Sequence, residues 1–197
     1  MLNSDTAKPV IITLPEAQKI LTDWFDILSE RDARADGIKI NGRAWRAELR
    51  RMSLPYGVMM CTGYDALRRK LLSCMSLRPV DEMALAIFVS VAVHIKSHKG
   101  NASFASQLGP DKEGKRAMSA LRFQRLQQAS EPEEFCLQLI RAVKLRGSEG
   151  VNILSLADSI FLWMREWQQR QEDQPVNSNP FARNRIRWAS EYLTLSR

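Results

Sequence analysis

The sequence is poor in the residues that build metal centres and disulfide frameworks. Only two histidines and three cysteines occur among its 197 residues. The cysteines are Cys61, Cys74 and Cys136, and no two of them form a CxxC pair. Neither a disulfide framework nor a zinc site is therefore indicated, and we expect reduced thiols in the core of a cytoplasmic protein.

The two histidines, His94 and His98, stand four residues apart, a spacing that can hold a metal on one helix face. Their neighbours Lys96 and Lys99 carry ammonium groups that repel a cation. The residues therefore favour hydrogen-bonded or solvent-facing imidazoles, and we expect no metal ion.

Catalytic motifs are missing as well. The chain has no GxSxG turn, no glycine-rich P-loop ending in Lys-Ser/Thr and no carboxylate cluster for a two-metal site. With two histidines, the choice of a general base is narrow. We expect a protein that is not an enzyme and that uses no cofactor.

No apolar run approaches the roughly 20 residues that cross a bilayer, and the N-terminus lacks the apolar stretch of a signal peptide. The apolar segment Met83–Ile95 is shorter and is interrupted by Ser90 and His94. Around a helix its apolar side chains would point in every direction, which is typical of a helix inside a core. We therefore expect it to be the central helix of a cytoplasmic protein with no membrane partner.

Strand patterns are nearly absent, since only 10–13 and 37–40 are candidates. We predict an all-α fold, a compact helical bundle of about seven or eight helices. Residues 1–12 should form a loose tail and residues 13–197 a single helical domain, with a break near 100–114 that divides it into two sub-bundles.

Several helix starts are recognisable. Thr13 and Ser130 begin capping boxes, Asn152 is typical of an N-cap, and Asn179-Pro180 opens the last helix. That helix should place Phe181, Trp188, Tyr192 and Leu195 on one face. The expected helices begin at about residue 13, cover about 42–52, 64–75, 79–95 and 117–129, and begin again at about 130, 152 and 179.

Positive charge dominates, and the formal net charge at pH 7 is +7. Such an excess favours a polyanionic partner, either nucleic acid or an acidic membrane, although a basic balance also serves solubility alone.

One cationic helix face is predicted within residues 42–51. Arg43, Arg46 and Arg50 would fall within about 60° of one another on a helix. The opposite face carries the apolar residues that would anchor it, Trp45, Leu49 and Met52. Guanidinium groups present a planar donor fork that suits phosphate, so we expect Trp45 to be buried and the arginine face to meet nucleic acid.

Further cationic clusters follow. Around the helix predicted over 117–129 they are Lys115, Arg116, Arg122 and Arg125. The next helix adds Arg141, Lys144 and Arg146, and an earlier cluster holds Arg68, Arg69 and Lys70. If the two later helices are neighbours, their cations form one patch, which together with the others indicates a charged groove.

Several motifs, in order, resemble the CasB family, the small subunit of the type I-E CRISPR surveillance complex Cascade. The resemblance spans about residues 14–195 and depends on the order and spacing of short motifs. These are Ala47-Glu-Leu-Arg-Arg51, His94-x-x-x-His98, Ser103-Phe104 with Leu108, Ser119 with Arg122-Phe-Gln-Arg-Leu126, Leu139-Ile-Arg141, Val151-Asn152, Leu156-Ala157, Trp163, Trp188 and Tyr192.

The resemblance implies a non-enzymatic helical subunit that contacts the backbone and large subunits, guide RNA, target DNA including the displaced strand, and a second copy of itself. It implies that basic surfaces stabilise the R-loop during antiviral defence. The residues that we expect to bind nucleic acid are Arg46, Arg50, Arg51, Lys115, Arg116, Arg122, Arg125 and Arg141.

Two other functions stay open from the residues. A DNA-binding regulator would need a recognition helix with base-reading side chains, and no compact helix-turn-helix pattern is present. A helical protein-interaction adaptor, whose charge is incidental, is the second.

Overall fold

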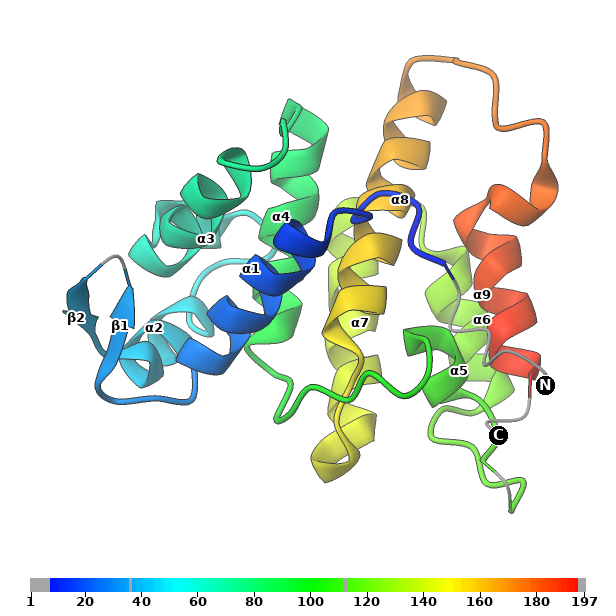
Figure 1. The fold of residues 1–197 in the computed structure, drawn as a ribbon. Helices are drawn as coiled ribbons and strands as arrows, with labels where there is room; N and C mark the ends of the chain where they lie inside the picture. The colour runs from blue at the N-terminus through cyan, green and yellow to red at the C-terminus, as the bar shows by residue number, and fades with distance from the viewer. Residues whose placement is uncertain (1–7, 36, 112, 195–197) are drawn as a thin grey trace.

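A computed structural model describes residues 8–35, 37–111 and 113–194, which form a mostly helical, compact fold (Figure 1). This confirms the predicted fold class. The helices are α1 Pro15–Ile27, α2 Gly42–Leu49, α3 Thr62–Leu72, α4 Pro79–Ala92, α5 Phe104–Leu108, α6 Ala120–Gln128, α7 Pro132–Arg146, α8 Ile153–Gln171 and α9 Asn184–Leu193. Short 3₁₀ turns cover Gly57–Met60, Gly147–Glu149 and Pro180–Ala182.

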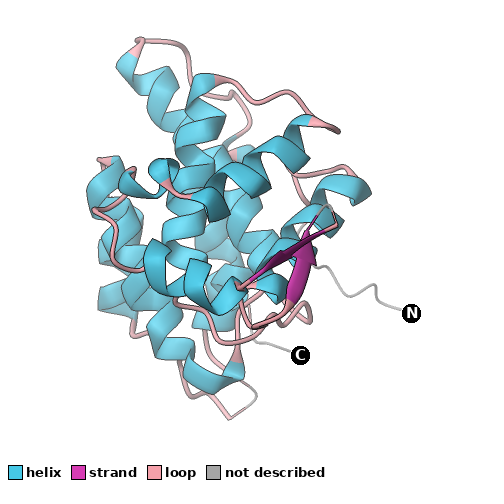
Figure 2. Cartoon of the chain, turned by 90° about the vertical axis from the view of Figure 1, so that its left-hand side faces the viewer, coloured by secondary structure: helices cyan, strands magenta, loops and turns pink. Residues whose placement is uncertain are grey.

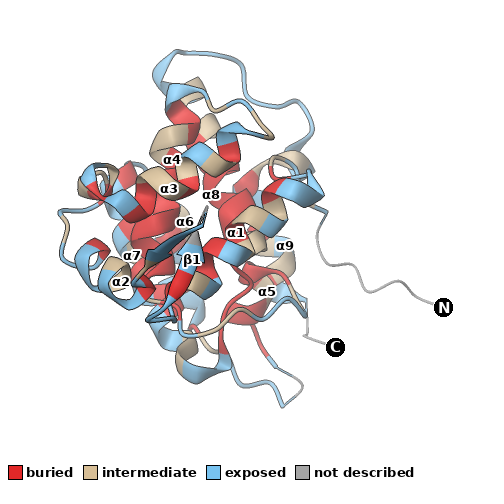
Figure 3. Ribbon diagram, turned by 60° about the vertical axis from the view of Figure 1, so that its left-hand side comes forward, coloured by how far each residue is buried: buried red, intermediate tan, exposed pale blue. Residues whose placement is uncertain are grey.

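The centre of the molecule is α4, which packs most extensively against α8. Residues 84–92 of α4 are all buried, as expected for a helix that is apolar on every side. Figure 1 shows α1, α2 and α3 on one side of this pair and α5, α6 and α9 on the other. Buried residues concentrate along the contacts between these layers (Figure 3). The prediction of a central helix is confirmed.

The described residues contain one small sheet, a two-stranded hairpin that projects from the helices (Figure 2). Strand β1, Ala33–Ala35, pairs antiparallel with β2, Ile38–Ile40. Gly37 has a φ of +80°, which suits glycine in the turn. Of the two strand candidates, 37–40 contains β2 and 10–13 forms no strand, while β1 was not among the candidates.

Helix ends agree with the sequence where a side chain caps directly. The Ser155 N–H donates to Asn152 Oδ1 at 3.1 Å, and α7 ends at Gly147, whose φ is +49°. The two capping boxes are wrong, because α1 and α7 have Leu14 and Glu131 at their N-caps. In both helices proline occupies the first position, which makes the residue directly before it the cap.

The C-terminal helix also starts later than predicted. Pro180 opens a 3₁₀ turn, and α9 begins only at Asn184. Trp188 and Tyr192 are buried as expected, whereas the Phe181 side chain is exposed. Leu195 lies outside the described residues.

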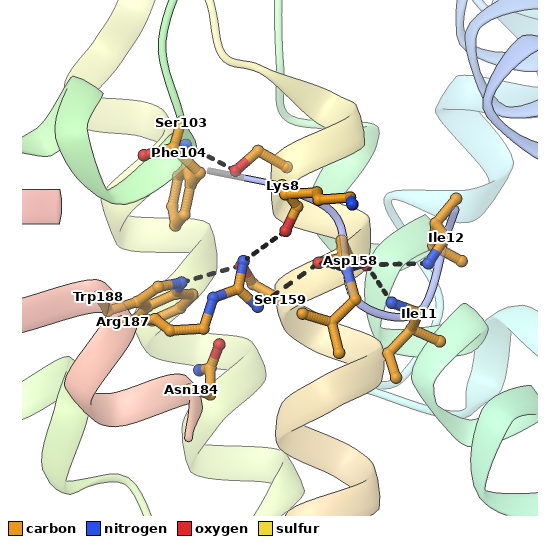
Figure 4. A network of polar contacts seen from close by, with 12 residues as sticks. Lys8, Ile11, Ile12, Ser103, Phe104, Asp158, Ser159, Asn184, Arg187 and Trp188 are labelled. Atoms are coloured by element: carbon orange, nitrogen blue, oxygen red, sulfur yellow. Dashed lines mark hydrogen bonds and ion pairs between the residues drawn. The ribbon is translucent and has the colours of Figure 1, made fainter. Parts of the chain in front are cut away.

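The N-terminal segment is fixed to the helices from residue 10 onwards (Figure 4). The backbone N–H groups of Val10, Ile11 and Ile12 donate to the Asp158 carboxylate of α8 over 2.6–3.0 Å. Ile12 is buried. The predicted loose tail is therefore wrong for residues 10–12, since a buried carboxylate needs these donors, and residues 1–7 lie outside the described part.

Helix α9 closes the same region. The Arg187 guanidinium lies 3.7 Å from the Asp158 carboxylate and donates to the Lys8 carbonyl at 3.4 Å. The Trp188 indole N–H donates to Ser159 Oγ at 2.9 Å. The N-terminal segment, α8 and α9 are thus joined by one polar network (Figure 4).

Candidate nucleic-acid interface

The arginines of α2 lie at the ends of other helices. Arg46 Nη1 donates to the Ile95 carbonyl at 3.2 Å, and Arg50 Nε donates to the Val93 carbonyl at 2.8 Å. Both carbonyls follow the end of α4, where backbone acceptors have no partner within the helix. A guanidinium at this end is also attracted by the negative pole of the helix. The arginine face expected to meet nucleic acid is therefore partly a cap for α4.

Arg46 is the least exposed of these arginines. Its guanidinium lies over the Phe25 ring, 5.6 Å from the centroid, and burial lowers its pKa. Its Nε and Nη2 atoms are buried without a hydrogen-bond partner among the described residues. Arg43 has a similar structural contact, because its Nε donates to the Ser29 carbonyl beyond α1 at 2.9 Å.

The apolar face of α2 anchors the helix as predicted, but unevenly. Leu49 is fully buried, whereas Trp45 and Met52 are half-buried against the core. Trp45 lines a crevice between α1, α2 and α3, beside Trp24. The expectation of a buried Trp45 is therefore only partly met.

His94 lies within reach of positive charges from both α2 and α7. Its pKa is lowered to about 4, first by burial and then by the positive charges of Lys144, Arg50 and Arg46. The imidazole is neutral at pH 7 and adds no further charge to the three cations. We refer to Arg46, Arg50, Lys144 and His94 as the α2–α7 cluster.

Two further predicted residues flank this cluster along the chain. Arg51 follows Arg50, the C-cap of α2, and Arg141 stands one turn before Lys144 on α7. Both side chains are exposed, and neither forms an ion pair with a carboxylate in the described ranges.

The remaining predicted cations surround α6. Arg122 and Arg125 are exposed on α6, and Lys115 and Arg116 are exposed in the loop before it. None of the four forms an ion pair among the residues that the structure describes. We refer to them together as the α6 surface.

The α6 surface is anchored by aromatic packing. The Phe123 ring stacks on the Tyr192 ring of α9 with a centroid distance of 3.9 Å. On the loop side, the Arg116 guanidinium lies over the Tyr192 ring, 5.8 Å from its centroid. Leu126 is buried beside them. Helix α6 is thus held by one face while its arginines stay in solvent.

The cluster at residues 68–70 behaves differently from these surfaces. Arg68 is paired with Glu82 at 2.6 Å and Arg69 with Asp65 at 2.9 Å, while Lys70 also has a partner. Its charge is therefore largely compensated locally, and it is a weaker candidate for phosphate binding.

The prediction of one patch from the 117–129 helix and its successor is met only in part. Helices α6 and α7 are in contact, but the positive charge of Lys144 acts on His94, which follows α4. The sequence reading also left out Arg185, an exposed cation of α9 whose carbonyl accepts a hydrogen bond from Gln127 of α6 at 3.0 Å. The absence of acidic residues over 174–190 was the available signal.

Among the described residues, no group of three or more His, Cys, Asp or Glu side chains is placed to hold a metal ion. His98 Nδ1 instead accepts the Ile153 N–H at 3.3 Å. Within the same residues, no helix has the length and apolar character that a bilayer span requires.

Comparison with known proteins adds one finding. The family profile of the CRISPR-associated protein Cse2 matches residues 45–193, most of the 197-residue chain. The match runs from α2 to the end of α9, so it contains all eight predicted nucleic-acid residues and leaves out α1 and the hairpin. No curated protein and no solved structure matches the chain.

Proposed function

Because the chain belongs to the Cse2 family, also called CasB, the small subunit of the CRISPR Cascade complex, we propose that it stabilises the R-loop by binding nucleic-acid backbones through the α6 surface and the α2–α7 cluster. It would act without catalysis. Its protein partners would be the backbone and large subunits and a second copy of the chain, and its nucleic-acid partners the guide RNA and both DNA strands.

The observation that carries this proposal is the unpaired charge of the α6 surface. Four exposed cations, two on α6 and two in the loop before it, have no carboxylate partner in the described part of the chain. Exposed arginines and lysines of this kind release condensed counterions when they contact phosphates, which drives association.

The same chemistry fits the task of an R-loop protein. Phosphate contacts carry no sequence information, so a surface of arginines accepts any guide and any target. Exchange of a DNA duplex for an RNA–DNA heteroduplex is nearly balanced in free energy, and a few backbone contacts suffice to shift it.

The test is the double substitution Arg122→Glu/Arg125→Glu. We expect weaker binding to single- and double-stranded DNA, and a log–log salt slope that is smaller by about 0.7–0.9 for each lost phosphate contact. Stability should be nearly unchanged, because both arginines are solvated and unpaired. Affinity is measured across a salt series, with a melting curve for each variant.

A matched control variant reverses the same number of charges at a distant part of the surface. Arg31→Glu/Arg34→Glu alters two exposed arginines at the hairpin, on the opposite side of the molecule from α6 (Figure 1). If the control weakens binding as much as the α6 variant does, the effect is one of net charge, and the α6 surface is not the binding site.

A further inference from the structure

The most exposed aromatic side chain of the described residues is Phe181, which is 75% accessible. It lies in the 3₁₀ turn Pro180–Ala182, in the segment that joins α8 to α9 (Figure 1). A single exposed apolar residue is ordinary on a protein surface. Phe181 needs further explanation because of how its backbone is held and because of the charges near it.

The turn that carries Phe181 is closed by several hydrogen bonds. The Phe181 N–H donates to Asn179 Oδ1 at 3.1 Å. Arg183 donates through both Nε and Nη2 to the Asn177 carbonyl, at 3.0 and 2.8 Å. The ring is therefore presented by an ordered turn, so that little backbone entropy would be lost if a ligand stacked on it.

The segment that contains this turn carries arginines, one of which is free of ion pairs in the described part of the chain. Residues 174–190 contain three arginines and no aspartate or glutamate. Arg187 is paired with Asp158, and the Glu166 carboxylate, which caps the first N–H of α9, lies near Arg183. Arg185 is exposed and has no ion pair among the described residues, and its backbone is bonded to the end of α6.

We propose that Phe181 is a stacking platform for an unpaired nucleobase and that Arg185 holds an adjacent phosphate, which makes this turn a site for single-stranded nucleic acid; this rests on the proposed function. Every base has a π face, so an aromatic ring binds unpaired bases with little regard to sequence. Bases inside a duplex are already stacked and do not reach such a ring. The apolar pocket of a protein partner would also accept Phe181, but Arg185, four residues further along the chain, is an exposed cation without an ion pair among the described residues and favours a polyanion.

The experiment uses the full-length protein and a labelled mixed-sequence single strand, with the same sequence as duplex. Phe181→Ala should weaken single-strand binding about 5- to 100-fold, the range of one lost base stack. Duplex binding should stay within about twofold. The salt slope should not change, since no ionic contact is removed.

Conservative variants separate stacking from hydrophobic contact. Phe181→Tyr and Phe181→Trp should bind the single strand like the parent, whereas Phe181→Leu should behave like Phe181→Ala. An abasic strand should bind the parent as weakly as it binds Phe181→Ala. Met60, which is 78% exposed at the end of a 3₁₀ turn, is the matched control, and Met60→Ala should change nothing.

Two results would overturn the stacking platform and leave the proposed function intact. One is a Phe181→Ala variant that binds the single strand like the parent while the parent keeps its salt-dependent affinity. The other is full rescue by Phe181→Leu, which would show that a non-aromatic apolar contact is enough and that no ring stacks on a base. If the parent chain binds neither single strand nor duplex, the proposed function and the platform fail together.

Discussion

The arginines of α2 and those of α6 look alike in the sequence but differ in the fold. In both helices they lie on a polar face opposite an apolar anchor. Arg46 and Arg50 of α2 donate to carbonyls at the end of α4, and Arg46 is half-buried. Arg122 and Arg125 of α6 are exposed and unpaired among the described residues. A cationic helix face therefore does not reveal by itself whether its donors are already used.

What decides the difference is the neighbour that each helix meets. Helix α2 begins against the end of α1, lies beside α3, and directs its arginines to the end of α4, so its cations complete the hydrogen bonding of the fold. Helix α6 packs on α7 through its apolar face and leaves its cations to solvent. Charge reversal should hence damage folding at α2 and binding at α6.

The largest effect is expected from the site where α2 begins. A Cβ atom on Gly42 would lie 1.7 Å from the Ile27 carbonyl oxygen, a backbone atom that cannot move alone. Gly42→Ala should displace α2 and lower the free energy of unfolding by about 3 kcal/mol. Urea unfolding measures this change. An α2 that tolerates the substitution without loss would show that its position does not depend on this contact.

A smaller effect should separate the two sets of arginines directly. Arg46→Ala removes a charge-assisted hydrogen bond and the packing of its stem, and should cost about 1–2 kcal/mol of unfolding free energy. Arg122→Ala should stay within about 0.5 kcal/mol. Arg46→Met keeps the stem and should recover part of the loss. Equal urea midpoints for Arg46→Ala and Arg122→Ala would contradict the proposed difference between the α2 and α6 arginines.

The smallest effect concerns pH. The pKa of His94 is about 4 in the folded protein and lies near its ordinary value of 6.5 when unfolded. Above pH 6.5 the stabilisation is fully present, and it is lost as the pH falls towards 4, because only the unfolded chain takes up a proton. The ring is half-exposed, so screening reduces the loss to about 1–2 kcal/mol. Unfolding measured from pH 7 to 4 checks this, and His94→Gln should flatten the curve.

The pKa of His94 also shows which of the two surfaces binds nucleic acid. A phosphate at the α2–α7 cluster would raise the pKa of His94, whereas one at the α6 surface would leave it unchanged. An NMR titration of the imidazole with and without single-stranded DNA distinguishes the two. A pKa that does not move, together with weakened binding of the Arg122→Glu/Arg125→Glu variant, would assign binding to α6 alone.

The elements that the sequence predicts well are those set by local chemistry. The core helix α4, the Asn152 cap and the end of α7 at Gly147 all depend on a few consecutive residues. The elements that it misses depend on distant contacts. Strand β1 needs β2, and the short helix α5 packs against α9, which follows it by more than 70 residues.

The same division applies to the candidate site. Exposure of Arg122 and Arg125 follows from the period of α6 around Phe123 and Leu126. The half-buried position of Arg46 does not, because it depends on where α4 ends in space. The helical period predicts Phe181 on one face with Trp188 and Tyr192, which is wrong because the turn Pro180–Ala182 interrupts the helix.

The hydrogen bonds between the N-terminal segment and Asp158 have a consequence for synthesis of the chain. Their donors and their acceptor are 146–148 residues apart, so the Asp158 carboxylate is synthesised long after the three backbone donors. Residues 10–12 thus leave the ribosome early but stay without these partners until α8 has followed them. Their capture belongs to the last steps of folding, as expected for contacts of high sequence separation. Nascent chains cut before residue 158 should lose protease protection of this segment even where α1 to α4 have already folded.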